Sequence, residues 1–218
     1  MESIHLSFSN LSPRERNKLL TGLIIPRPIA LVTTVSSAGV VNAAPFSFFN
    51  VFAHDPPTIV LGIERRRNGA IKDTERNLNE SKDLVVNMVD EGLLHAMNDC
   101  AIDFPAHLSE PVTLGLSLTK GVEISVPHLT NSPCSIECRQ TMNVPLGPVS
   151  CLIVCEVLGM HLRPGVIDQK TLRADEKNYE TIGRLMGLLY AKPGKTFTLP
   201  RETFLEWNQK KKRFQKQC

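Results

Sequence analysis

Short apolar runs separated by turn residues dominate the pattern of hydrophobic and polar positions along this chain. The first two runs read as a hairpin, because 29–35 is rich in β-branched residues, a Ser-Ser-Ala-Gly turn follows, and apolar residues resume at Val40. Similar runs predict further strands at 57–64, 83–90, 122–129, 132–144 and 148–165. Short turns rather than regularly spaced helices join these strands, so the pattern favours a closed or nearly closed antiparallel barrel over a parallel βαβ sheet.

Polar segments between these runs carry helix signals. One helix is expected to begin after Ser12, a good N-cap residue that has Glu15 at the third position after it. A second helix is expected over 72–82, capped by Asp73 or Thr74. The expected fold class is therefore mainly β, with a few helices outside the barrel.

The rest of the chain continues the same domain. A third helical pattern occupies 91–102, and 179–194 fits either a short helix or an arm that covers another part of the molecule. No change of composition and no internal repeat marks a second domain, so we expect a single domain over 1–218. A run of basic residues within 205–218 reads as a solvated C-terminal tail.

Composition and charge narrow the classes of partner. The 218 residues are 42% hydrophobic and 22% charged, which is ordinary for a globular protein. A formal net charge of +3 is too small to predict nucleic acid as the main partner. We see neither a secretory signal nor an apolar run long enough to span a membrane, so we expect a cytoplasmic protein without a membrane partner.

The cysteines allow two interpretations. Cys134 and Cys138 are four residues apart, as are Cys151 and Cys155, which could form two halves of a zinc site. Apolar residues fill both spacers, however, and positions four apart on a strand share one face. Reduced thiols in the core are therefore the favoured interpretation, no metal site is expected, and a cytosolic protein fits.

Polar residues among aromatic ones mark the first candidate site. Thr33 and Thr34 occupy opposite faces of an expected strand, and Ser47 and Asn50 lie among the four phenylalanines of 46–52. A strand edge lined by rings and polar groups suits a flat heterocycle. Each feature also has a structural interpretation, since phenylalanines usually form the core and adjacent threonines usually only form a strand.

The start of the second helix is the other candidate site. Lys72, Asp73 and Thr74 place a cation and a hydroxyl beside helix N–H groups, which suits a phosphate, although they could equally be a helix cap beside a lysine. A ligand that is flat at one end and phosphorylated at the other, such as FMN, would use both sites. The chain has no G-x-S-x-G, H-E-x-x-H or P-loop motif, and no G-x-G-x-x-G follows a strand, so we expect no catalytic side chain.

Several blocks of the sequence resemble one family in the same order. The blocks "PRPIALVTTVSSAGVVNAAPFSFFNVFAHDPPTIVLGI" and "KDTERNLNESKDLVVNMV" resemble the flavin reductase-like, FMN-binding split-barrel family. Four later blocks, "DFPAHLSEPVTLGL", "VPHLTNSPCSIECR", "IVCEVLGMHL" and "IGRLMGLLY", are similar to later parts of that family. The resemblance covers roughly residues 24–200. It implies a six-stranded antiparallel Greek-key split barrel with flanking helices, and a homodimer with one FMN in each of two sites near the subunit interface.

The resemblance also implies which residues contact FMN. The two threonines would lie along the ribityl chain and ring edge, the residues of "FSFFN" at the isoalloxazine, the residues of "KDT" at the phosphate, and the arginine of "PRP" at the phosphate or ribityl end. The arginine and tyrosine of the last block would come from the partner chain. The full set is Arg27, Thr33, Thr34, Ser47, Phe48, Asn50, Lys72, Asp73, Thr74, Arg184 and Tyr190. In that last block Met186 occupies a position where many relatives have glycine, which could narrow the space over the ring.

The activity implied by the resemblance belongs to the flavin. A hydride would pass from NADH or NADPH to FMN, and the electrons would go on to a small-molecule acceptor that the sequence does not identify. Two alternatives stay open at this stage. The chain could be an FMN-binding electron carrier or flavin store without nicotinamide turnover, or an interaction protein that has lost the cofactor.

Overall fold

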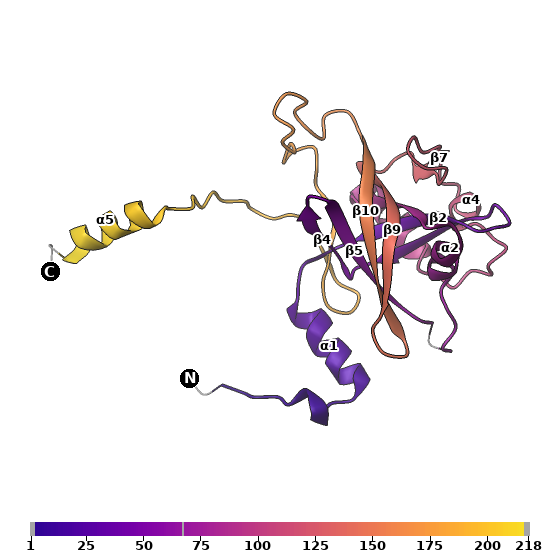
Figure 1. Cartoon of the computed structure of the whole chain (residues 1–218), viewed down its shortest axis with the longest axis horizontal. Helices are drawn as coiled ribbons and strands as arrows, with labels where there is room; N and C mark the ends of the chain where they lie inside the picture. Colours follow the sequence, from indigo (N-terminus) through magenta and orange to yellow (C-terminus); the bar gives the residue numbers. More distant parts are fainter. Residues whose placement is uncertain (1–2, 67, 216–218) are drawn as a thin grey trace.

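A single antiparallel sheet of seven strands forms the body of the molecule (Figure 1). The computed structural model describes residues 3–66 and 68–215. Along the sheet the strands follow the order β3-β2-β6-β9-β10-β5-β4, and every pairing is antiparallel. Their bounds are β2 Ala30–Val35, β3 Val41–Phe46, β4 Phe49–His54, β5 Pro57–Glu64, β6 Asp83–Met88, β9 Cys134–Pro145 and β10 Ser150–Leu162.

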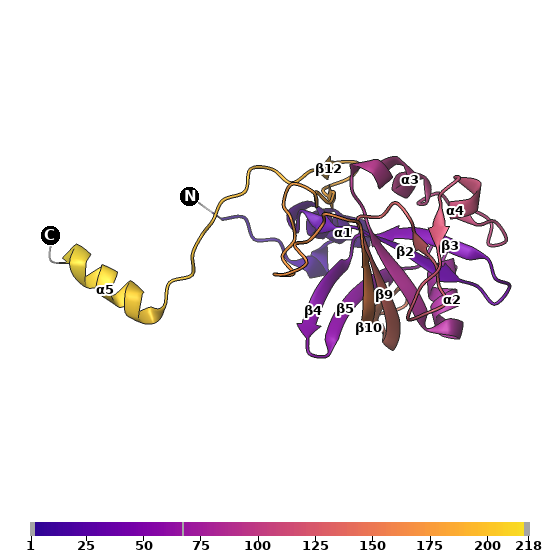
Figure 2. The same ribbon diagram turned by 90° about the horizontal axis from the view of Figure 1, so that it is seen from above.

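The sheet curls strongly but does not close (Figure 2). Its two edges, β3 and β4, follow one another in the chain and are joined only by Ser47 and Phe48. In the part of the chain that the structure describes, β3 and β4 do not pair with each other. One reason is that a side chain occupies part of the β3 edge. The Glu110 carboxylate accepts the Ala43 N–H at 3.0 Å. The expectation of a six-stranded barrel is therefore corrected to an open sheet of seven strands.

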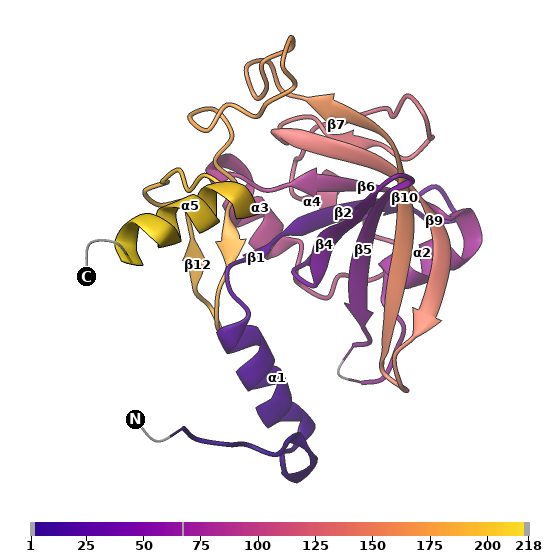
Figure 3. The same cartoon turned by 60° about the vertical axis from the view of Figure 1, so that its left-hand side comes forward.

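Short pieces complete the β structure. One small sheet joins β1 (Arg27–Pro28), β11 (Gly183–Arg184) and β12 (Tyr190–Ala191), so the segment 179–194 is an arm rather than a helix. Another pairs β7 (Leu118–Thr119) with β8 (His128–Leu129). Figure 3 shows the first of these sheets next to the end of α1.

The helices lie outside the sheet. The Ser12 cap is confirmed, because the Ser12 N–H donates to Glu15 at 2.8 Å and the Glu15 N–H donates back to the Ser12 hydroxyl at 3.3 Å. The expected helix at 91–102 is split into a 3-10 turn and a short α-helix. The bounds are η1 Phe8–Asn10, α1 Pro13–Leu23, α2 Asp73–Ser81, η2 Glu91–Leu93, α3 Leu94–Asp99, α4 Glu110–Thr113 and α5 Phe204–Gln215. Helix α5 stands away from the sheet in Figures 1 and 2, and no described helix is long and apolar enough to cross a membrane.

Inward-facing aliphatic side chains and thiols fill the interior of the curled sheet. Cys134, Cys138, Cys151 and Cys155 are buried and free, so the expectation of reduced core thiols is confirmed for these four. Burial raises the pKa of Cys134 to about 11 and that of Cys155 to about 12, which keeps both protonated at neutral pH. Cys218 lies outside the described residues.

The stretch 122–129 is the main error of the strand predictions. Only its last two residues form a strand, and the preceding backbone is held by a side chain instead. The buried Glu137 carboxylate on β9 accepts the N–H groups of Val122, Glu123 and Ile124 at 2.8 to 2.9 Å. It also pairs with His161 of β10. An alternating apolar pattern could not reveal this, because the partner is a distant carboxylate rather than a neighbouring strand.

Candidate functional site

The first turn of α2 has no side-chain cap. Lys72 is the N-cap of this helix, in an extended conformation, and it makes no side-chain cap bond. This corrects the expectation that Asp73 or Thr74 caps the helix. A lysine side chain has no acceptor atom, so it cannot satisfy the first N–H groups of the helix. Those groups and the lysine ammonium are therefore the donors available at this end of α2.

The ammonium of Lys72 lies in a partly buried environment. Its Nζ atom is 5.2 Å from the centroid of the Phe46 ring, and it forms no ion pair with any residue in 3–66 or 68–215. Burial lowers the pKa of Lys72, whereas the charges of Glu64 and Asp103 act in the opposite direction. A half-buried cation without a paired carboxylate favours binding of an anionic ligand.

The two residues after Lys72 shape the turn from inside. The Asp73 carboxylate is ion-paired with Arg66 at 2.5 Å and also with Arg76. The Thr74 hydroxyl, which is 1% exposed, accepts a hydrogen bond from Asn42 of β3 at 3.0 Å. Both side chains are thus committed to protein partners, and Asp73 is neutralised by two arginines.

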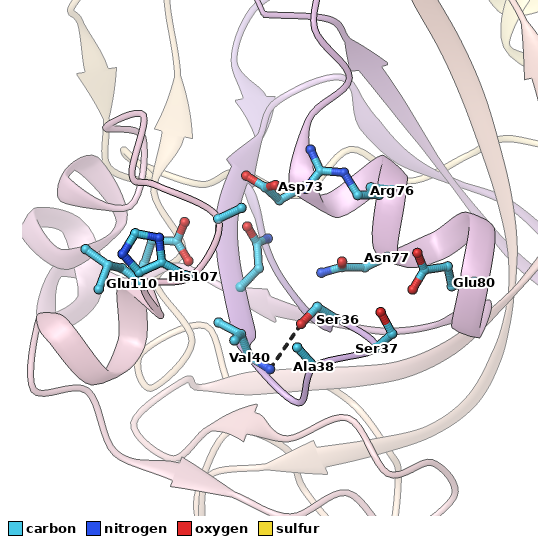
Figure 4. A pocket seen from close by; sticks show the side chains of 13 residues that line it. Ser36, Ser37, Ala38, Val40, Asp73, Arg76, Asn77, Glu80, His107 and Glu110 are labelled. Atoms are coloured by element: carbon cyan, nitrogen blue, oxygen red, sulfur yellow. Dashed lines mark hydrogen bonds and ion pairs between the residues drawn. The ribbon is translucent and has the colours of Figure 1, made fainter.

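Two cavities meet behind this turn. The smaller, about 80 Å³, is lined by residues that include Lys72, Thr74 and Arg66. The larger, about 330 Å³, lies between the β2–β3 turn, α2 and the loop before α4 (Figure 4). They share a wall of Asn42, Asp73 and Glu110. Burial raises the pKa of the Glu110 carboxyl in that wall.

Thr33 and Thr34 lie beneath the surface. Each is 0% exposed, and each hydroxyl already has a protein partner. Thr33 donates to the Pro127 carbonyl at 2.7 Å, and Thr34 accepts from Asn77 of α2 at 3.0 Å. Neither residue lines the two cavities behind α2. The structure therefore gives both threonines a part in fixing β2 to its neighbours.

The four phenylalanines of 46–52 divide between the interior and the surface. Phe46 is buried and Phe49 packs against the same cluster, so these two belong to the core. Phe48 is 41% exposed and lies over Gly62, where a Cβ would come within 2.9 Å of the Phe48 Cβ. A side chain at position 62 would displace this ring. Phe52 is exposed on the edge strand β4, as is Asn50, whose side chain accepts the Val51 N–H.

Arg27 joins three parts of the chain next to Ser47. Its Nε donates to the Ser47 hydroxyl at 3.4 Å, and its Nη1 donates to the carbonyls of Thr21 and Ile24 at the end of α1. Its Nη2 donates to the Leu185 carbonyl in the arm at 3.1 Å. Burial, and to a lesser degree the charge of Arg184, lowers the pKa of this guanidinium. Arg27 is thus a buried clamp, and the structure does not bring it to Lys72.

The arm brings Arg184 and Tyr190 to the same end of the molecule. Arg184 pairs with Arg27 across the small sheet, and its guanidinium carbon is 4.4 Å from the centroid of the Tyr190 ring. Met186 packs on α1, where its sulfur would lie 3.2 Å from a Cβ at Gly22. Met186 therefore holds the arm against α1.

Nine of the eleven candidate residues thus form two adjoining groups, and the buried Thr33 and Thr34 belong to neither. One is Lys72, Asp73 and Thr74 at α2, and the other surrounds Arg27 and Ser47 at the β3–β4 connection. Phe46 joins them, because its ring contacts Lys72 and its neighbour in the chain is Ser47. Sequence reasoning missed Asn42 and Glu110. Asn42 could have been noticed as a polar residue inside an apolar run, whereas no local pattern identifies Glu110.

Known proteins match both the sequence and the fold. Residues 22–190 match the model of the flavin reductase like domain. A protein of Halalkalibacterium halodurans is 38% identical over 208 residues, which cover 91% of this chain and 96% of that relative. The structure of 2-nitrobenzoate 2-nitroreductase from Pseudomonas fluorescens has a TM-score of 0.85 at 35% identity, with 92% of this chain and 98% of that chain covered. Nitrilotriacetate monooxygenase component B from Bacillus cereus has a TM-score of 0.87 at 34% identity, with 91% and 100% covered.

These matches extend over most of the chain and confirm the resemblance found in its motifs. Solved structures that share less than a fifth of their residues with this chain have the same fold, among them a Shewanella frigidimarina protein with a split barrel domain, which has a TM-score of 0.78 at 16% identity. The family model, the relatives in sequence and the solved structures all indicate the same family. The chain belongs to the flavin reductase-like family.

Proposed function

We propose that this protein is an FMN-dependent oxidoreductase that takes a hydride from NADH or NADPH and passes the electrons to a small-molecule acceptor. The observation that carries the proposal is the uncapped first turn of α2 beside the half-buried ammonium of Lys72, which has no ion-pair partner among the described residues. Membership of the flavin reductase-like family supports a flavin as the ligand. The related 2-nitrobenzoate 2-nitroreductase, at 35% identity, supports a small molecule as the acceptor.

The donor set at α2 fits the phosphate of FMN. Lys72 and the first N–H groups of the helix would hold the phosphate, and Asn42 would fix Thr74 beside it. Arg66 and Arg76 neutralise Asp73, so this buried carboxylate would not repel the phosphate strongly. When bound, FMN would supply the redox chemistry, because it can accept a hydride and release electrons to a second substrate.

The residues at the β3–β4 connection would hold the ring end of the cofactor. Ser47, Phe48 and Asn50 would contact the isoalloxazine, and Arg27 would fix Ser47 while tying α1 to the arm. Thr33 and Thr34 would act from beneath by holding β2 in place. Arg184 and Tyr190 of a second copy would shape the side where the substrate enters. No side chain in this set needs to act as an acid or base.

Steady-state oxidation of NADH and NADPH tests the proposed activity. The FMN-loaded protein is expected to consume at least one of the two nucleotides in the presence of oxygen or excess free flavin. Consumption can be followed by absorbance, with heat-denatured protein and FMN alone as controls. A protein that holds FMN but oxidises neither nucleotide would instead be an electron carrier or flavin store.

We also propose that the working unit is a homodimer. Exposed apolar side chains support this, since Val51 and Phe52 on the edge strand β4 are 68% and 69% exposed and Leu23 on α1 is 77% exposed. A monomer rarely leaves a strand edge and a helix face of this kind uncovered. Light scattering should therefore give twice the 24.2 kDa of one chain. A monomer that still binds FMN would contradict this arrangement.

A further inference from the structure

A cavity of about 640 Å³ lies at the end of β5, outside the groups described above. Helix α1 contributes Pro13, Arg14 and Asn17 to its lining, the end of β5 contributes Glu64 and Arg65, and Val149 precedes β10. The Arg65 N–H donates to the Val149 carbonyl at 2.8 Å, which fixes the backbone on that side. Three segments far apart in the sequence therefore build this cavity.

Two exposed guanidinium groups line the cavity. Arg14 and Arg65 are both exposed, and neither forms an ion pair with a residue that the structure describes. Among the described residues, Glu64 is the only carboxylate in the lining, so it offsets one of the two arginine charges. Guanidinium groups bind phosphate through paired N–H donors. The Ser12 side chain and Glu15 cap the start of α1, so the arginines are the main donors here.

The cavity adjoins the proposed ring site along one strand. The Gly62 N–H donates to the Phe48 carbonyl at 2.7 Å, and Arg65 follows Gly62 by three residues. At about 3.3 Å per residue, Arg65 lies roughly 10 Å along the chain from the Phe48 contact. A dinucleotide can span such a distance, with its nicotinamide near Phe48 and its adenosine end at the arginines.

We propose that this cavity binds the 2′-phosphate of NADPH, so that Arg14 and Arg65 select NADPH over NADH. The inference rests on the proposed function and deepens it by naming the nucleotide. A phosphate monoester carries close to two negative charges at neutral pH, and both arginines are free to pair with it. Asn17 adds an amide donor on the same wall. The Glu64 carboxylate lowers the affinity for the phosphate, because both groups are negatively charged and repel each other.

The test is equilibrium binding of 2′,5′-ADP and 5′-AMP to the FMN-loaded protein by titration calorimetry. The parent is expected to bind 2′,5′-ADP more tightly than 5′-AMP, and Arg14→Ala or Arg65→Ala should weaken only 2′,5′-ADP, each by about tenfold or more. Glu64→Gln should tighten it several-fold. Lys18→Ala removes the same charge from α1 without touching this cavity, because Lys18 lines a different one, and it should change neither probe.

The binding result and the activity separate the two proposals. Equal affinity for both probes, or no effect of either arginine, overturns the assignment of this cavity even if both nucleotides are oxidised. Arginine-dependent binding of 2′,5′-ADP to a protein that oxidises neither nucleotide would uphold the phosphate seat and overturn the reductase activity. A parent that oxidises NADH as efficiently as NADPH also contradicts the selection.

Discussion

Replacing Lys72 by alanine is expected to weaken FMN binding by roughly 10- to 100-fold, since a hydrogen bond to a charged group is worth about 1.5–3 kcal/mol. The structure gives the physical reason. The ammonium is half-buried, has no carboxylate partner among the described residues, and stands at an uncapped helix start. Losing it removes the lysine ammonium from the proposed phosphate site. Quenching of FMN fluorescence on titration with protein measures the change directly.

The matched controls for this variant separate binding from folding. Lys170→Ala removes an exposed lysine elsewhere and should leave FMN binding unchanged. Thr74→Ala would be harder to interpret, because Thr74 is buried and bonded to Asn42, whereas Thr74→Ser keeps the hydroxyl and should bind FMN normally. The melting temperature of Lys72→Ala should match that of the parent without FMN. An unchanged FMN affinity in a folded Lys72→Ala protein would show that the phosphate lies elsewhere.

Replacing Glu137 by alanine is expected to lower the free energy of unfolding by about 3–5 kcal/mol, which is the usual cost of removing one partner from a buried ion pair. Glu137 is 1% exposed and holds three backbone N–H groups of the segment 122–124 as well as His161. All four groups would lose their partner at once. A domain of this size is stabilised by only about 5–15 kcal/mol, so the effect is large. Urea denaturation followed by circular dichroism measures it.

The control and the pH dependence sharpen this prediction. Glu123→Ala removes an exposed carboxylate from the same segment and should change the free energy of unfolding little.

Burial acts to raise the pKa of Glu137, but the hydrogen bonds from Val122, His161, Ile124 and Glu123 outweigh it, so the pKa lies below its ordinary value of 4.5. The unfolded chain therefore takes up this proton first. Stability from Glu137 is present above about pH 4.5 and is lost as the pH falls through the lower folded value, a component that Glu137→Ala should lack. A variant as stable as the parent would contradict the clamp.

Local sequence patterns predicted most of the strands and helices. The strand at 57–64 and the start of α1 follow from neighbouring residues alone, through apolar runs in one case and a capping box in the other. The segment 122–129 has a strand-like pattern too, yet its backbone bonds go to Glu137. The edge of β3 likewise meets Glu110 rather than a strand. These departures depend on contacts between distant residues, which a local pattern does not contain.

The candidate site divides in the same way. Lys72, Asp73 and Thr74 are consecutive, so the sequence predicted that they share one place. The choice between contact with a ligand and support of the fold depends on tertiary partners. Arg27 illustrates this, because its donors reach carbonyls of α1 and of the arm, the latter 158 residues away in the chain. The cavity between α1 and the end of β5 could not be foreseen for the same reason.

Binding of flavin and its reduction can be followed in one absorbance experiment. FMN is added to the protein, the mixture is desalted, and NADPH and then NADH are added without oxygen. We expect flavin bands that survive desalting and that bleach with a nicotinamide nucleotide, NADPH being the more effective. Bands that survive but do not bleach with either nucleotide would contradict the oxidoreductase activity. A protein that retains no flavin would contradict the site at α2 as well.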